Sequence, residues 1–352
     1  MRRCISTWAV GLLWLSTPAC AQSMPSTRRL LDGVAVPVSQ LEGASTAATP
    51  APRTDAAVAL LADVRNPTTT DAMLRNLATL ARTCDWARRY DVIVFHEGGA
   101  AGDALRPRLE ALGNRTRLRL RARDISDVFA TRAPATTDWP RRRLRTFGIG
   151  YRRMCRFWFS GVFEVADVRN LTYLLRLDTD SELRCRPGSR DPFELMAHQN
   201  AVYGYVAVKT DHPMVARNLT AFGAAYARGL PQIQDAFYRF PPRPPPNCPA
   251  PMFYTNFEVM DVSWFAAPRA VAFARAVDAT GQIFGNRWGD APLRWLTLAL
   301  FASRTQLLCF GGEYDYRHRG PQDHCGLSFN LTVPGCQAGG GGAPVRPPPL
   351  PL

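Results

Sequence analysis

Apolar runs alternate with a helical pattern early in this chain, and that alternation limits the fold more than any other feature. The runs "AAVALLADV" (56–64) and "YDVIVFHEG" (90–98) are typical of strands buried on both faces of a sheet. Between them, "TTDAMLRNLATLARTC" (69–84) predicts a helix that begins at threonine or aspartate caps. "TRLRLRARDI" (116–125) can supply a third strand. This alternation predicts an α/β sandwich built on a parallel sheet.

The same pattern continues further along the chain. "AVYGYVAVK" (201–209) has strand character, and "APLRWLTLALFAS" (291–303) has apolar residues at helical spacing. The proline-rich segment "PPRPPPNCPAP" (241–251) has apolar sequence on both sides. We therefore expect it to be a large internal loop and not a domain boundary.

The two ends of the chain have the composition of targeting or linker segments. Residues 1–21 combine two arginines, an apolar stretch and a small-x-small cleavage pattern, which predicts a signal peptide or a short signal anchor. Residues 22–54 predict a flexible stem, and the Gly- and Pro-rich residues 337–352 predict a disordered tail. The globular domain is expected at 55–336. Acceptor sequons agree with exposure to the secretory lumen, at Asn114, Asn170, Asn218 and Asn330.

Charge and cysteine content exclude two classes of site. The formal charge is +14, but Lys209 is the only lysine among 43 basic residues, and the arginines are scattered. No RNA- or DNA-binding module accompanies them, so no nucleic-acid partner is expected. Without the signal, an odd number of cysteines remains and no CxxC pair is present, which predicts up to three disulfides and one spare thiol instead of a zinc site. These are Cys84, Cys155, Cys185, Cys248, Cys309, Cys325 and Cys336.

The acidic residues that stand out follow the run "YLLRL" (173–177). Asp178 and Asp180 come directly after it, at the expected carboxyl end of a strand, where ligands of such sheets bind. Two carboxylates at alternate positions can hold a hard divalent cation such as Mg²⁺ or Mn²⁺, which can bridge to a diphosphate. A DxD pattern alone is weak, because solvated strand ends produce it by chance.

Further motifs around the DxD carry a resemblance to a known family. "YRRMCRFWFSG" (151–161), "RLDTD" (176–180), "DPF" (191–193), "NFEV" (256–259) and "RWGDAP" (287–292) occur in this order. In identity, order and spacing they resemble the fungal α-1,2-mannosyltransferases of glycosyltransferase family 15. The resemblance implies a single GT-A type nucleotide-sugar transferase domain, with a mixed, mainly parallel central sheet flanked by helices.

The resemblance also implies a metal site. The family uses GDP-mannose with Mn²⁺, and its metal motif is normally Glu-Pro-Asp, where this chain has Asp178-Thr179-Asp180. Asp180 matches the retained acid, and Asp178 replaces glutamate with a shorter arm. His318 in "EYDYRHRG" is the best match to the family's metal-contacting histidine.

Other residue roles are likewise implied only by the resemblance. Glu258 matches the glutamate proposed as the family's nucleophile, although the acceptor can instead attack on the same face while Glu258 stabilises the reacting sugar. Tyr151 matches a tyrosine near the donor phosphates. Some cysteines fall at or near family positions, which favours disulfides over catalysis: Cys155, Cys185, Cys248 and Cys325. For Trp288 and Asp290 the resemblance implies sugar or acceptor contacts, although Trp288 can equally be a core residue. Arg65 and Arg156 can contact phosphate or guanine by bidentate hydrogen bonds, and both can instead be structural.

These observations predict a metal-dependent retaining transferase of the Golgi lumen. It would move mannose from GDP-mannose to a mannose-terminated glycan or glycoprotein, with α-1,2 linkage, in N- or O-glycosylation, and a membrane tether is open. Two alternatives remain: a GT-A transferase with another donor sugar, and a catalytically silent secretory glycan-binding protein. The intact carboxylates and His318 argue against the silent protein.

Overall fold

A seven-stranded sheet forms the centre of the molecule. The structure is a computed structural model and describes residues 55–129, 147–318 and Cys336. The strand order is β10-β6-β9-β4-β1-β2-β3, and in these described residues only β9 runs antiparallel to its neighbours. The strands are β1 (Ala56–Ala62), β2 (Asp91–His96), β3 (Arg119–Asp124), β4 (Tyr173–Leu177), β6 (Tyr203–Tyr205), β9 (Phe257–Asp261) and β10 (Leu307–Cys309). The predicted mixed, mainly parallel sheet is confirmed.

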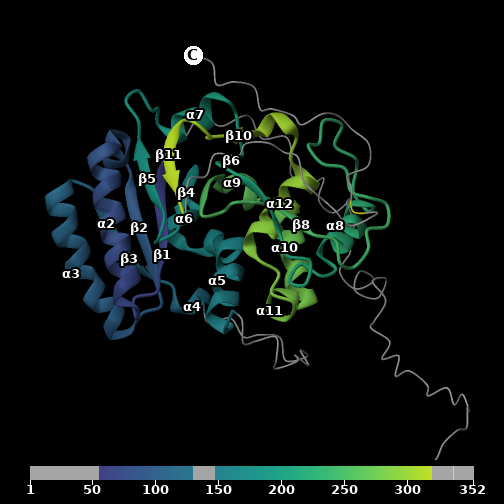
Figure 1. The fold of residues 1–352 in the computed structure, drawn as a ribbon, viewed down its shortest axis with the longest axis horizontal. Helices are drawn as coiled ribbons and strands as arrows, with labels where there is room; N and C mark the ends of the chain where they lie inside the picture. Colours follow the sequence, from purple (N-terminus) through teal and green to yellow (C-terminus); the bar gives the residue numbers. More distant parts are fainter. Residues whose placement is uncertain (1–54, 130–146, 319–335, 337–352) are drawn as a thin grey trace, which may run out of the picture.

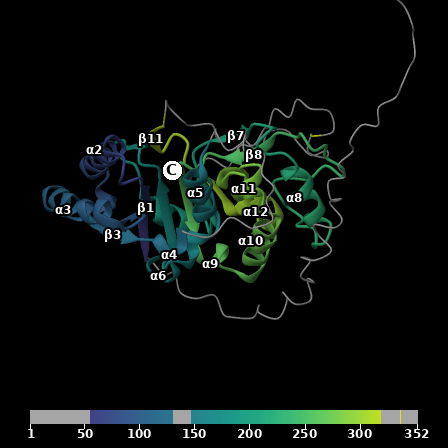
Figure 2. The ribbon, with the colours of Figure 1, turned by 90° about the horizontal axis from the view of Figure 1, so that it is seen from below.

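Helices cover both faces of this sheet, as Figures 1 and 2 show. One face carries α2 (Pro67–Thr83) and α3 (Gly99–Thr116), and the other carries α5 (Ile149–Phe159), α10 (Pro268–Thr280) and α12 (Asp290–Phe301). The remaining helices of the described residues are η3 (Asp85–Arg89), α4 (Ser126–Phe129), η5 (Gly161–Glu164), α6 (Ala166–Arg169), α7 (Pro192–His198), α8 (Leu219–Ala227), α9 (Val262–Phe265), α11 (Gln282–Gly285) and η6 (Arg304–Gln306).

Side-chain alternation along the strands explains the two layers. In β1, Ala57 and Ala59 pack toward α5 and α12, whereas Val58 and Leu60 pack toward α2 and α3. Because successive side chains of a strand point to opposite faces, a strand apolar at every position is buried on both sides. The first three predicted strands are all found. Helix α2 begins earlier than predicted, since Pro67 occupies its first turn and Asn66 accepts hydrogen bonds from the Thr68 and Thr69 amides.

Two small antiparallel pairs complete the fold. Strand β5 (Glu182–Cys185) pairs with β11 (Tyr314–Arg317), and β7 (Val208–Asp211) pairs with β8 (Ala250–Phe253). The predicted strand at 201–209 is therefore split between β6 and the start of β7. The β5–β11 pair brings the end of the described domain back to the residues that follow β4.

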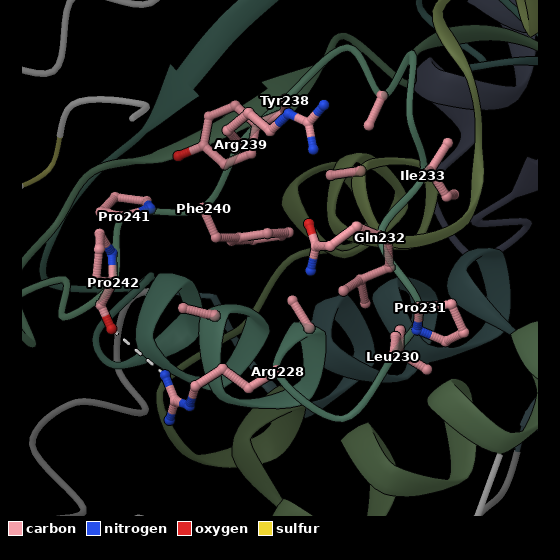
Figure 3. Close-up of a pocket in the computed structure, with 15 residues that line it drawn as sticks. Arg228, Leu230, Pro231, Gln232, Ile233, Tyr238, Arg239, Phe240, Pro241 and Pro242 are labelled. Atoms are coloured by element: carbon pink, nitrogen blue, oxygen red, sulfur yellow. Dashed lines mark hydrogen bonds between the residues drawn. The ribbon is translucent and has the colours of Figure 1, made fainter. Parts of the chain in front are cut away.

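The proline-rich segment lies within the connection from α8 to β8. The first part of this connection packs against α8 and α12 and lines an open pocket of about 150 Å³. Figure 3 shows Tyr238 and Phe240 at this pocket, with Arg228 donating a hydrogen bond to the Pro242 carbonyl (3.4 Å). Cys248, near the end of the connection, is bonded to Cys336. The segment is thus a packed internal loop, as predicted.

The cysteines mostly follow the prediction. Cys84 is bonded to Cys185, which ties the end of α2 to β5, and Cys309 is also disulfide-bonded. Cys155 is a buried free thiol, so the expectation that its family position favours a disulfide is wrong. It lies in α5, and its side chain packs in the domain core.

The Cys84–Cys185 bridge is expected to stabilise the domain strongly, because it closes a loop between residues 101 positions apart. Replacing both cysteines with serine should lower the free energy of unfolding by about 2–5 kcal/mol. Urea unfolding followed by tryptophan fluorescence measures this loss. Unchanged stability in the double variant would show that the bridge does not constrain the unfolded chain.

Candidate active site

A pocket of about 350 Å³ opens where β4 ends, and we call it the β4 pocket. It lies at the carboxyl end of a parallel strand, where open α/β sheets bind ligands. Several charged side chains line it together with aromatic and small residues. The lining residues are Phe147, Tyr151, Met154, Arg176, Asp178, Asp180, Asp211, Met252, Tyr254, Thr255, Asn256, Arg287, Gly289, Asp290, Ala291, Pro292 and His318.

The structure brings the three predicted metal ligands together. Asp178, Asp180 and His318 each offer a ligand atom, and these atoms lie within 4.8 Å of one another. His318 follows β11, whose pairing with β5 carries it to the turn after β4. Its Nε2 atom lies 3.1 Å from Asp180 Oδ1. Two carboxylates and a histidine nitrogen form a donor set suited to Mn²⁺, while the carboxylates alone suit Mg²⁺.

Two neighbours fix the orientation of these groups. The Tyr254 hydroxyl lies 2.5 Å from Nδ1 of His318, which leaves Nε2 pointing toward Asp180. Asn256 donates a hydrogen bond from its side-chain amide to Asp178 Oδ2. Partners of this kind hold ligand side chains in place before a metal arrives. Neither residue was predicted as part of the site.

Arg176 is the centre of the buried charges behind the pocket. It lies in β4 and is 2 % exposed. Its guanidinium donates to Asp178 Oδ1 (3.1 and 3.2 Å), to Asp290 Oδ2 (2.5 Å) and to Glu258 Oε1 (3.3 Å). The carboxylates around it raise the pKa of Arg176 against the opposing effect of burial, so it stays charged.

Glu258 is fully buried and does not line the β4 pocket. Its Oε2 atom accepts hydrogen bonds from Arg294 Nε (3.1 Å) and the Tyr203 hydroxyl (3.0 Å), while Oε1 faces Arg176. Burial raises the pKa of the Glu258 carboxyl, although Arg294 and Arg176 both oppose that shift. The predicted nucleophile is therefore bracketed by two arginines, and its catalytic role stays a prediction.

Asp290 begins α12 and faces the pocket from the other side of Arg176. Its Oδ2 atom also accepts a hydrogen bond from the Thr255 hydroxyl (2.9 Å). Burial alone would raise the pKa of this carboxyl, but the charge and hydrogen bond of Arg176, together with hydrogen bonds from Thr255 and Cys155, lower it overall. Asp290 therefore stays ionised, and the free thiol of Cys155 supports it instead of forming a disulfide.

Tyr151 also lines the pocket, beside an ion pair. Arg287 donates to the Tyr151 hydroxyl (3.2 Å) and to both carboxylate oxygens of Asp211 (3.0 and 3.2 Å). Burial raises the pKa of Tyr151, so its phenol stays protonated and can donate a hydrogen bond. Burial also raises the pKa of Asp211, against the effect of Arg287.

Three predicted contact residues do not line the pocket. Arg65 is exposed and pairs with Glu97 (2.6 Å). Arg156 pairs with Asp278 (2.8 Å) on the α5 side of the molecule. Trp288 is a core side chain that donates a hydrogen bond to the carbonyl of Arg217 (2.9 Å). Their roles toward donor or acceptor stay predictions, while Asp290 is the predicted contact residue that the pocket includes.

Sequence reasoning missed most of the residues that orient the site. A signal was present for two of them, because Arg176 interrupts an apolar strand and Arg294 interrupts an apolar helix. An arginine at such a position is rarely buried unless it is paired. Arg287 and Asn256 lie inside motifs that carry the family resemblance. Tyr254 and Asp211 gave no signal, because only the fold brings them to the pocket.

The sequence model described as "Glycolipid 2-alpha-mannosyltransferase" matches residues 147–332, just over half of the chain. The chain belongs to the glycolipid 2-alpha-mannosyltransferase family. The matched range contains the whole lining of the β4 pocket. The predicted family, and with it a glycosyltransferase class, is confirmed.

Fungal proteins are among the relatives of this family member. A probable mannosyltransferase KTR4 of Saccharomyces cerevisiae is 25% identical over 186 residues, which cover 50% of this chain and 39% of the relative. The O-glycoside alpha-1,2-mannosyltransferase homolog 4 of Schizosaccharomyces pombe is 26% identical over 244 residues, or 58% of this chain and 55% of the relative. The chain spans about half the length of the curated relatives it matches.

Solved structures of mannosyltransferases share the fold of this family member. Ktr4p from S. cerevisiae in complex with GDP superposes with a TM-score of 0.64 at 17% identity, covering 76% of this chain and 72% of the other. Core-mannan synthase A from Aspergillus fumigatus, in a Mn/GDP form, gives a TM-score of 0.62 at 20% identity, covering 78% and 77%. The GT-A architecture predicted for this chain is confirmed. None of the helices in the described residues is long and apolar enough to cross a membrane.

The charge pairing around Glu258 predicts a structural cost of neutralising it. In Glu258→Gln, Arg176 and Arg294 lose the carboxylate between them, so the free energy of unfolding should fall by about 3–5 kcal/mol. Urea unfolding measures the change. Glu194→Gln is the control, because Glu194 is an exposed partner of Arg89 and its loss should change stability by less than about 1 kcal/mol. If the two variants are equally stable, the pairing of Glu258 with Arg176 and Arg294 does not stabilise the fold.

Proposed function

We infer that this chain is a metal-dependent retaining mannosyltransferase. It would transfer mannose from GDP-mannose to a hydroxyl of a mannose-containing glycan, with α-1,2 linkage. The observation that carries this inference is the grouping of Asp178, Asp180 and His318 at the end of β4, in a chain of this family. The Mn/GDP form of core-mannan synthase A, which shares the fold, supports the same donor and metal.

The charges of the pocket favour a bound cation. Arg176 and Arg294 together offset two of the three carboxylates in the buried cluster, which are Asp178, Glu258 and Asp290. One negative charge remains, and Asp180 adds another beside it. A divalent cation held by Asp178, Asp180 and His318 would balance them and would offset the charge that builds on a departing diphosphate.

Other residues of the β4 pocket can stabilise the departing diphosphate and bind the sugar. The protonated Tyr151 hydroxyl, held by Arg287, can donate a hydrogen bond to developing negative charge. Asp290 stays ionised at the pocket surface and can accept hydrogen bonds from sugar hydroxyls. Because Glu258 is buried behind Arg176, we infer that it acts by holding Arg176 and not by direct attack.

We also propose where the reaction takes place. Residues 1–21 and the acceptor sequons favour entry into the secretory pathway, with the Golgi lumen as the site of action. Residues 1–54 and 337–352 lie outside the described residues, so signal, stem and tail stay predictions. A membrane tether through the N-terminal segment and a role in N- or O-linked glycan extension belong to the same proposal.

If Asp180 binds the metal, Asp180→Asn should abolish Mn²⁺-dependent turnover, because a neutral amide replaces the charged carboxylate ligand. Transfer of mannose from GDP-mannose to methyl α-mannoside, in Mn²⁺ or in EDTA, is the measurement. EDTA should stop the wild-type reaction. Glu182→Gln is the matched control, since Glu182 lies two residues away but pairs with Arg184 and is not part of the metal group.

Full activity of Asp180→Asn would contradict the proposed metal site. An equal loss of activity in Asp180→Asn and Glu182→Gln would also contradict it. Turnover of a nucleotide sugar other than GDP-mannose, with the same metal dependence, would support the metal site and correct the proposed donor. A folded protein that binds mannosides but turns over no donor would favour the silent glycan-binding alternative.

A further inference from the structure

Phe147 is an exposed aromatic residue at the mouth of the β4 pocket. Three large apolar side chains of the described residues are exposed, namely Phe147 (47 %), Ile149 (45 %) and Met214 (73 %). Phe147 differs from the other two because it lines the pocket. An exposed aromatic ring at a site entrance suggests a contact with a ligand that comes from solvent.

The backbone of Phe147 is held in a conformation that an aromatic residue rarely adopts. Its φ angle is +73°, in the left-handed region, which costs about 1–3 kcal/mol outside glycine. The buried Arg152 holds it there by donating from Nε to the Phe147 carbonyl (3.2 Å). Arg152 in turn donates to the Phe284 carbonyl at α11, so the core of the domain fixes the position of this residue.

The Phe147 ring is fixed from one side by its neighbours. The Arg287 guanidinium carbon lies 4.5 Å from the ring centroid, and the Tyr151 ring centroid lies 4.7 Å away. Arg287 itself has a left-handed φ of +65° and is paired with Asp211. Its Nε has no hydrogen-bond partner among the described residues. The described residues thus position the guanidinium tightly but leave its Nε without a hydrogen-bond partner.

These residues have the chemistry that recognises a pyranose. The C–H face of a sugar ring packs on an aromatic ring, while carboxylate and guanidinium groups bind its hydroxyls. Asp211 and Arg287 lie beside Phe147 and line the same pocket. The metal group lies on other elements of that pocket, at the ends of β4 and β11. A ligand that meets Phe147 can therefore share the pocket with a diphosphate-bearing donor.

We propose that Phe147, Arg287 and Asp211 form an acceptor subsite that takes a terminal hexopyranoside, with its ring on Phe147 and its hydroxyls on Arg287 and Asp211. The proposal rests on the proposed function for its reaction. It assigns the acceptor to the solvent-facing ring because the acceptor must enter while the donor occupies the pocket. Of the three residues only Arg287 lies inside a sequence motif, and nothing in the sequence indicated that Phe147 and Asp211 join it.

The test compares Phe147→Ala with Phe147→Tyr and Ile149→Ala in the same purified chain, with GDP-mannose, Mn²⁺ and methyl α-mannoside. Phe147→Ala should raise KM for methyl α-mannoside about tenfold and change KM for GDP-mannose less than twofold. Phe147→Tyr should restore the wild-type acceptor KM, because it keeps the ring. Ile149→Ala removes an equally exposed apolar side chain outside the pocket, so it should change neither KM by more than twofold.

An unchanged acceptor KM in Phe147→Ala would overturn the subsite, as would an equal rise in both KM values. If the wild-type chain transfers no mannose, the proposed function fails separately. Ligand-observed NMR of methyl α-mannoside then decides: binding to wild type that Phe147→Ala loses supports the subsite, and absence of binding overturns it.

Discussion

The buried guanidinium of Arg176 is the interaction on which this site depends. A charge in the core of a sheet must be compensated, and Arg176 meets three carboxylates from three parts of the fold. Asp178 follows β4 itself, Glu258 lies on the antiparallel β9, and Asp290 begins α12. Arg294, one helical turn after Asp290, continues the chain of alternating charges to the far side of Glu258.

This cluster links the architecture to the chemistry. Because β9 runs opposite to β4, Arg176 and Glu258 pair across the sheet and Asn256 reaches Asp178 at its edge. The short β5–β11 pair then returns His318 to that edge, where Tyr254 orients its ring. The metal group therefore lies just beyond the ends of paired strands, and Tyr254 and Asn256 orient two of its side chains. The wall that carries Tyr151, Arg287 and Phe147 is built separately, from α5 and the turn before α12.

Local patterns predicted the first strands of the sheet well, because strands buried on both faces form apolar runs, as in β1 and in residues 92–95 of β2. The DxD and the family motifs also identified Asp178, Asp180 and His318 as candidate metal ligands, since these residues lie inside recognisable sequence motifs. The surrounding partners could not be found in the same way. Tyr254 and Asp211 reach the pocket only through the β7–β8 pair, and no local pattern encodes that pairing. Arg156 and Trp288 lie inside family motifs, yet their side chains point away from the pocket toward Asp278 and the core.

The central claim is that Asp180 and His318, with Asp178, hold a divalent cation that binds a nucleotide diphosphate. A crystal structure of the chain grown with MnCl₂ and GDP, with data collected at the manganese absorption edge, tests this directly. We expect one strong anomalous peak in contact with Asp180, His318 and the diphosphate oxygens. GDP bound in the β4 pocket without such a peak, or manganese bound away from these side chains, would contradict it.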